Sequence, residues 1–63
     1  MYTSRITMQE ISLDQHADMV EVSTALTSVD LGGALVADFA HPTLGRVILV
    51  NTAGGRCACI AIP

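Results

Sequence analysis

The chain has 63 residues and a formal net charge of −3, and 51% of its residues are hydrophobic although only two are aromatic. This length predicts a single small domain over residues 1–63, near the lower size limit for a self-sufficient core. The composition excludes a disordered chain, and three scattered arginines without any lysine exclude nucleic acid as a partner.

Neither a membrane partner nor a secreted protein is expected. The longest apolar stretch, residues 57–63, is far shorter than the ~20 residues that span a bilayer. The extended backbone of a strand separates Cys57 and Cys59 too far for an easy disulfide, which favours a reducing compartment. We therefore expect a cytoplasmic protein, or a virion-associated one if the gene belongs to a phage.

The N-terminal half allows two interpretations. A first strand is expected over residues 2–11, and Ser12 with Gln15 matches a capping box that opens a short helix somewhere within 12–22. Residues 20–29 have apolar side chains at both helical and alternating spacing, and they are rich in β-branched residues. The favoured interpretation is a helical turn over 12–18 and a strand from Val20 to about Thr27.

The C-terminal half predicts a three-stranded antiparallel meander over about 34–62. Three strand-length segments, 34–40, 46–50 and 56–62, are separated by short connections that contain proline, glycine and asparagine. A short helix over 34–40, capped by Asp30, is the lesser alternative. The expected fold is thus a small mostly-β or α+β domain.

The last two segments have an unusual pattern, because neither alternates between apolar and polar residues. If Gly54 and Gly55 form a two-residue turn, Val50 lies opposite Cys59 and Val47 opposite Ile62, and both faces of the hairpin are apolar. A strand that is apolar on both faces needs a cover on both.

The leading hypothesis is therefore a non-enzymatic interaction protein that acts through this hairpin. Its partner would be a second copy of the chain or another protein, as in an oligomeric accessory subunit, a phage structural protein or a small inhibitor. No catalytic residue and no cofactor are expected. The predicted interface consists of Val47, Leu49, Ile60, Ile62 and Pro63.

A small metal-binding protein is one alternative. Cys57 and Cys59 could form half of a site for zinc or copper(I), with His16 or His41 completing it. Since no second cysteine pair exists, packing is the favoured role of both thiols. Both histidines fit solvated surface positions.

A modified-peptide precursor is the other alternative. Gly54-Gly55 followed by Arg56-Cys57-Ala58-Cys59 resembles the junction of leader and core in plantazolicin-type azole peptide precursors. The resemblance implies a leader of residues 1–55, a core of residues 56–63, and partner enzymes that convert the cysteines to thiazoles. The segment lacks the run of serine and threonine that such cores carry.

Overall fold

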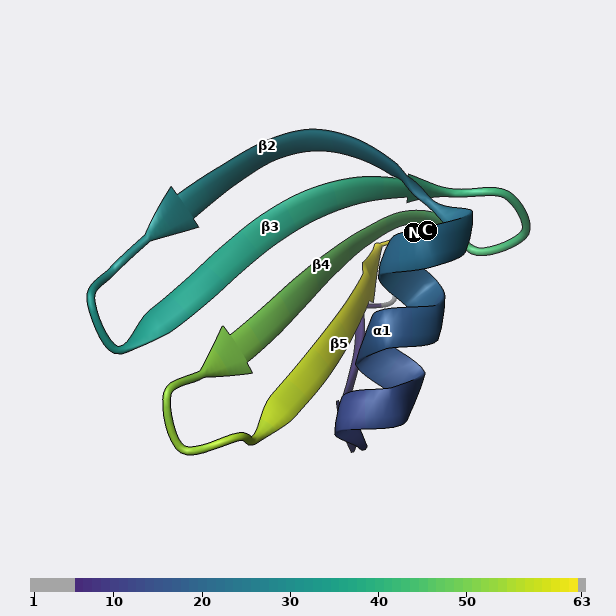
Figure 1. The fold of residues 1–63 in the computed structure, drawn as a ribbon. Helices are drawn as coiled ribbons and strands as arrows, with labels where there is room; N and C mark the ends of the chain where they lie inside the picture. The colour runs from purple at the N-terminus through teal and green to yellow at the C-terminus, as the bar shows by residue number, and fades with distance from the viewer. Residues whose placement is uncertain (1–5, 63) are drawn as a thin grey trace, which may run out of the picture.

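The structure, a computed structural model, describes residues 6–62. Its elements in chain order are β1 (Thr7–Ile11), α1 (Leu13–Val22), β2 (Thr24–Asp30), β3 (Ala34–His41), β4 (Gly45–Thr52) and β5 (Cys57–Ile62). The strands form one antiparallel sheet in the order β1-β5-β4-β3-β2, and α1 lies across one side of it (Figure 1). The predicted mostly-β fold, its C-terminal meander and its short helix are confirmed.

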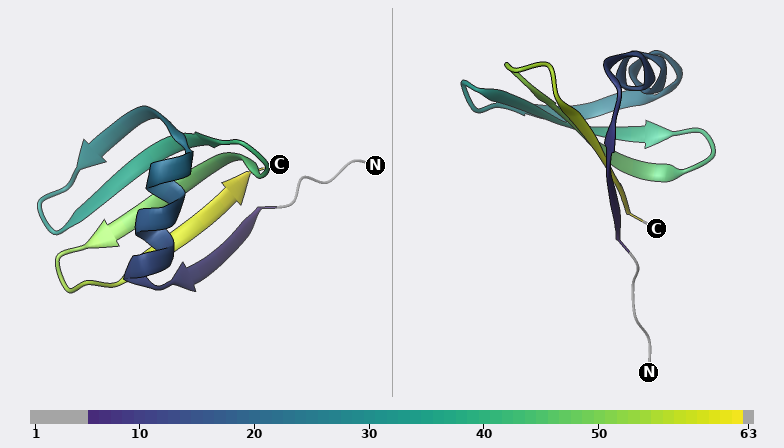
Figure 2. Two further views of the ribbon diagram at one scale, coloured as in Figure 1. Left: turned by 45° about the vertical axis from the view of Figure 1, so that its right-hand side comes forward. Right: turned by 90° about the horizontal axis from the view of Figure 1, so that it is seen from below.

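The helix is the connection between the two edges of the sheet. β1 and β2 are consecutive in sequence but lie at opposite edges, so the chain must cross the strands between them. That path covers four strand spacings, about 19 Å, and a ten-residue helix supplies about 15 Å of it. Figure 2 shows α1 running obliquely over the sheet, with no element of residues 6–62 on the opposite side.

The start of α1 and the range 12–22 given for the helix are confirmed, but the helix does not end near residue 18 as favoured. The Ser12 hydroxyl accepts a hydrogen bond from the Gln15 backbone N–H at 3.1 Å, and the Ser12 N–H donates to the Gln15 side chain at 2.9 Å. The predicted strand from Val20 to about Thr27 is wrong in its start, because α1 continues to Val22 and β2 begins only at Thr24. Each β-branched residue lowers the stability of a helix by only a few tenths of a kcal/mol. This cost is small, and the helix must be long enough to connect the two edges of the sheet.

Two other expectations concern strands. The alternative of a helix over 34–40 is wrong, since this segment is β3 and pairs with both β2 and β4. The first strand, expected over residues 2–11, is present as β1 from Thr7; residues 1–5 lie outside the described residues.

The β4–β5 turn has three residues rather than two, and this corrects the predicted register. The Thr52 N–H donates to the Arg56 carbonyl at 2.9 Å, and the Gly55 N–H donates to the Thr52 carbonyl at 3.0 Å. Gly55 has a φ of +83°, the left-handed conformation that favours glycine at the end of such a turn. Val50 therefore lies opposite Ala58, not Cys59. A slip of one residue exchanges the faces of a strand relative to its neighbour.

The core lies entirely between the sheet and α1. In β3, β4 and β5 the odd-numbered side chains point toward the helix, and Leu49 and Val47 are the most deeply buried, with 1% and 0% exposed. Met19 of α1 packs against this cluster. The buried core residues are Ile11, Ala37, Phe39, Val47, Leu49, Cys57 and Cys59.

Candidate functional site

The side of the sheet opposite α1 is the candidate site, and we call it the open face. It carries the even-numbered side chains of the three central strands together with those of β1 that share their register. Its apolar members are Met8, Ala34, Val36, Ala40, Ile48, Val50, Ala58, Ile60 and Ile62, together with Val29, which β2 places opposite Val36 on the same side.

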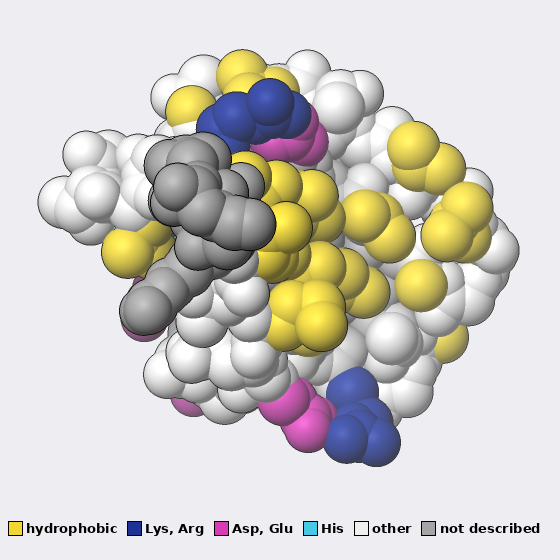
Figure 3. Space-filling model, turned by 180° about the vertical axis from the view of Figure 1, so that it is seen from behind, with side chains coloured by type: hydrophobic (Ala, Val, Ile, Leu, Met, Phe, Trp, Pro, Cys, Tyr) yellow, Lys and Arg dark blue, Asp and Glu magenta, His cyan; other side chains and the backbone are white. Residues whose placement is uncertain are grey.

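These apolar side chains form a continuous surface that solvent reaches. Figure 3 looks directly at the open face and shows hydrophobic side chains gathered over its middle. The central residues, such as Ile48 and Ile60, are half-buried by their neighbours within the sheet, and Met8 on the edge strand is 72% exposed. An exposed apolar surface of this kind is typical of an interaction site.

Two ion pairs border the apolar surface at opposite ends, where Figure 3 shows adjoining blue and magenta groups. One joins Arg46 at the start of β4 to Asp38 on β3. The other joins Arg56, just before β5, to Glu10 on β1. Because β4 and β5 are antiparallel, the starts of these two strands lie at opposite ends of the sheet.

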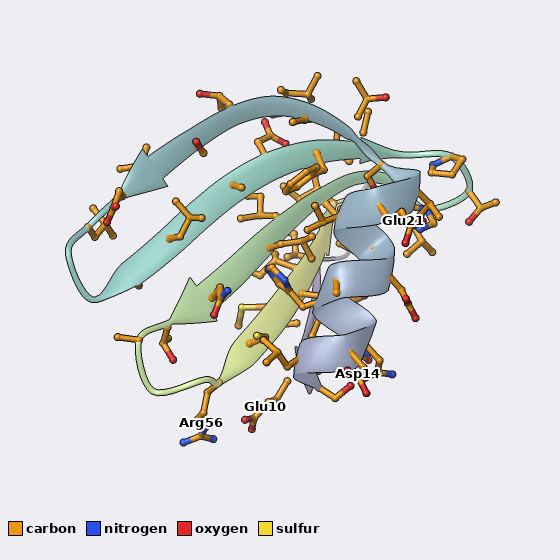
Figure 4. The ribbon with its side chains drawn as sticks, in the orientation of Figure 1. Glu10, Asp14, Glu21 and Arg56 are labelled. Atoms are coloured by element: carbon orange, nitrogen blue, oxygen red, sulfur yellow. The ribbon has the colours of Figure 1, made fainter. Side chains whose placement is uncertain are left out.

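The Glu10–Arg56 pair has two-pronged geometry. The Arg56 Nε donates to Glu10 Oε2 at 2.9 Å, and Arg56 Nη2 donates to Oε1 at 2.8 Å. Figure 4 shows the two side chains facing each other below the β4–β5 hairpin. The hydrogen bonds and the charge of Arg56 hold the pKa of Glu10 below its ordinary value, while the pKa of Arg56 is raised. Both side chains are exposed, so the pair adds little to stability.

A shallow pocket lies between this ion pair and the apolar surface. It has a volume of about 210 Å³ and is lined by Glu10, Val50, Thr52, Arg56, Cys57 and Ala58. Ala58 has the smallest side chain of those that β5 places on the open face, between the larger Val50 of β4 and Glu10 of β1. The open face is therefore hollowed at one end of β5.

The structure separates the residues predicted as an interface. Ile60 and Ile62 lie on the open face, but Val47 and Leu49 point to the other side and are buried under α1. The difference follows from the three-residue turn and its register. Pro63 lies outside the described residues. The predicted interface did not include Met8, Val36, Ile48 or Val50, although the uninterrupted apolar run of β4 was a signal for Ile48 and Val50.

Both cysteines lie in the core. Cys57 and Cys59 are reduced and buried on the helix side, and burial raises the pKa of Cys59. Within residues 6–62, no group of three or more His, Cys, Asp or Glu side chains could hold a metal ion. Residues 57–62 are strand β5, which pairs on both sides, so release of residues 56–63 would remove an interior strand of the sheet.

The two histidines lie apart, one at the end of β3 and the other on α1. His41 ends β3, and its Nδ1 accepts hydrogen bonds from the Thr43 and Leu44 backbone N–H groups at 3.2 and 3.1 Å. These bonds organise the β3–β4 turn. His16 lies half-buried on α1. The two residues are on different elements, and the Thr43 hydroxyl, 3.3 Å from His41 Nδ1, belongs to the same turn as the backbone groups that His41 binds.

No protein-family model, curated protein or solved structure matches this chain. In the described part of the chain, no helix has the length and apolar character needed to span a membrane. The open face is therefore interpreted from its own composition and geometry.

Proposed function

We propose that this chain is a non-enzymatic interaction protein that binds a protein partner through the open face of its sheet. The observation that carries the proposal is the apolar surface on the side that α1 leaves uncovered. A half-buried cluster around Ile48 and Ile60, bordered by two ion pairs, has the apolar centre and polar rim of a protein interface.

The position of the polar groups supports a protein partner. Each arginine of the described residues is paired with a carboxylate, so the open face offers no unpaired positive charge for a phosphate or carboxylate ligand. The backbone of the central strands is fully paired with neighbouring strands. What remains for recognition is apolar contact area, which favours a complementary apolar protein surface. We place this activity in the cytoplasm, consistent with the free thiols.

The proposal is tested by photochemical footprinting with a diazirine probe. Extract of the cells that produce the protein is labelled, and so is the purified chain diluted below about 1 μM, where weak association is disrupted. We expect lower labelling of Ile48 and Ile60 in the extract than in the dilute chain. Val22, which is 57% exposed on α1, serves as the internal reference.

Equal labelling of Ile48 and Ile60 in both samples would contradict the proposal, because a bound partner must shield them. Equal protection of Val22 would also contradict it, since the partner would then cover the molecule without preference for the open face.

A further inference from the structure

We infer that the partner of the open face is a second copy of the same chain, packed face to face around a twofold axis that crosses β5 near Ile60. This inference rests on the proposed function and specifies its partner. It is carried by charge distribution, by the shape of β5 along its length, and by the area of the face.

The charge distribution favours a like partner. On the open face every described cation is paired with a carboxylate, so the face is neutral although the chain carries a net charge of −3. The described carboxylates outside these pairs lie on α1 and at the end of β2; they are Asp14, Asp18, Glu21 and Asp30. The open face is therefore a side through which two acidic molecules can meet without bringing unpaired carboxylates together.

Face-to-face packing also separates the acidic helices. Each helix lies on the outer side of its own sheet, and packed layers are about 10 Å apart, so the two helices are separated by about 30 Å. This exceeds the Debye length of about 8 Å at physiological ionic strength. At either end of the face a neighbour meets both a cation and an anion, so opposite charges are available in either orientation.

The shape of β5 is complementary to itself. Ala58 and Ile62 are each two residues from Ile60 and lie on the same face, one at the hollow and the other at the opposite end of the strand. A twofold axis across β5 at Ile60 reverses the strand direction, so it places Ile62 of each copy over the Ala58 hollow of its partner. A twofold interface requires such pairs, in which each contact occurs twice.

The area of the face fits a weak dimer. Five strands span about 24 Å and six residues along them about 20 Å, which gives roughly 480 Å² per copy and about 1,000 Å² for two copies. This value is at the lower limit for specific association, so we expect a micromolar dissociation constant. Pairing through the free edge of β2 is disfavoured, because a bulge at Ala25/Thr27 interrupts its ladder.

The test is sedimentation velocity of the purified chain from about 1 to 200 μM, a range that brackets the expected dissociation constant. Ile62→Ala removes both protruding side chains of the dimer, and Ala58→Ile fills both hollows. Each is expected to raise the dissociation constant about tenfold or more, since the twofold axis doubles every loss. The double variant Ala58→Ile/Ile62→Ala restores large-to-small pairing and is expected to recover most of the affinity.

Val22→Ala, an apolar truncation on α1, is the matched control and should leave dimerisation unchanged. Far-ultraviolet circular dichroism checks that every variant keeps its fold. A wild-type monomer at 200 μM would overturn the inference. So would a dimer that none of the open-face variants weakens, or a double variant weaker than both single ones.

The footprinting experiment separates this inference from the proposed function. If the purified chain stays monomeric while the extract still protects Ile48 and Ile60, a different protein occupies the face and only the inference of a second copy is wrong. If the open face is protected in a monomer at every dilution, the chain covers itself and both proposals fail.

Discussion

The two faces of the sheet have nearly the same side-chain chemistry but very different surroundings. The helix side contains all the buried core residues, including Leu49 with 1% exposed. The open face has isoleucine and valine at adjacent positions of the same strands, yet none of these is buried. Neighbouring residues such as Ile48 and Leu49 thus differ only in which side of β4 they occupy.

This contrast shows that composition does not determine which apolar residues form the core of so small a domain. A single ten-residue helix covers part of one face of the sheet, and no element of the described residues covers the other face. The register of β4 and β5 decides which set of side chains the helix meets. The remaining set is the part of the protein that association can use.

The sharpest test of this contrast replaces neighbours on β4. Leu49→Ala is expected to lower the free energy of unfolding by about 2–5 kcal/mol, because it leaves a cavity beneath α1. Ile48→Ala removes a half-exposed side chain and should cost less than half as much. Urea denaturation at about 1 μM, where a micromolar dimer is largely dissociated, measures both. Equal losses would show that the two faces are equally covered.

The next test concerns the turn that sets the register. Gly55→Ala places a side chain at φ +83° and is expected to cost about 1–2 kcal/mol. Gly54→Ala is the matched control. Gly54 does not have a positive φ, and a Cβ added there would lie 4.0 Å from its nearest neighbour, Thr52 Oγ1, so the effect should stay within about 0.5 kcal/mol. Thermal unfolding compares them. A larger loss for Gly54→Ala would argue against this turn geometry.

A third test addresses the start of the covering helix. Ser12→Ala removes the hydroxyl that accepts the Gln15 N–H and should cost about 1 kcal/mol. Ser23→Ala, at the other end of α1, removes a buried hydroxyl without a hydrogen-bond partner in the described residues and should be neutral or stabilising. Chemical denaturation that ranks Ser23→Ala as the more harmful change would contradict this assignment.

The smallest expected effect comes from the border of the open face. The pKa of Glu10 is lowered beside Arg56, so its contribution to stability is present above the ordinary carboxyl pKa and is lost as pH falls through the lowered value. Glu10→Gln should remove that part of the acid dependence, whereas Glu21→Gln on α1 should retain it. Urea midpoints between pH 7 and 3 provide the measurement. Identical pH profiles for wild type and Glu10→Gln would contradict the ion pair.

Much of the fold could be predicted because it depends on local chemistry. The Ser12–Gln15 capping box marks the helix start, and turn residues such as Pro42 and Gly54 mark the ends of the meander strands. The sequence left open whether α1 ends near residue 18 or at residue 22, because this depends on where β2 lies relative to β1. That arrangement is a property of the whole sheet rather than of Val20 or Val22.

The sequence predicts only part of the open face, because the side on which a residue lies depends on the register of β4 and β5. The sequence of β4 and β5 shows that both faces are apolar, but one residue more or less in the turn exchanges which side chains face each other. Of the residues predicted for the interface, Ile60 and Ile62 lie on the open face, while Val47 and Leu49 belong to the core. Hydrogen bonds around Thr52, which only the structure shows, settle the register.

The pairing of β1 with β5 also has a consequence for folding. These are the first and last described strands, and their ion pair joins residues 46 positions apart. The β2–β5 meander closes through short turns, whereas β1 docks only after a long loop has closed, and such nonlocal pairing is slow. During that interval α1 is not anchored at both ends, and the meander exposes apolar side chains on both sides. We expect pulsed hydrogen exchange to show that the β1 amides are protected last. The docking of β1 would then end the period in which the folding chain is most prone to aggregate.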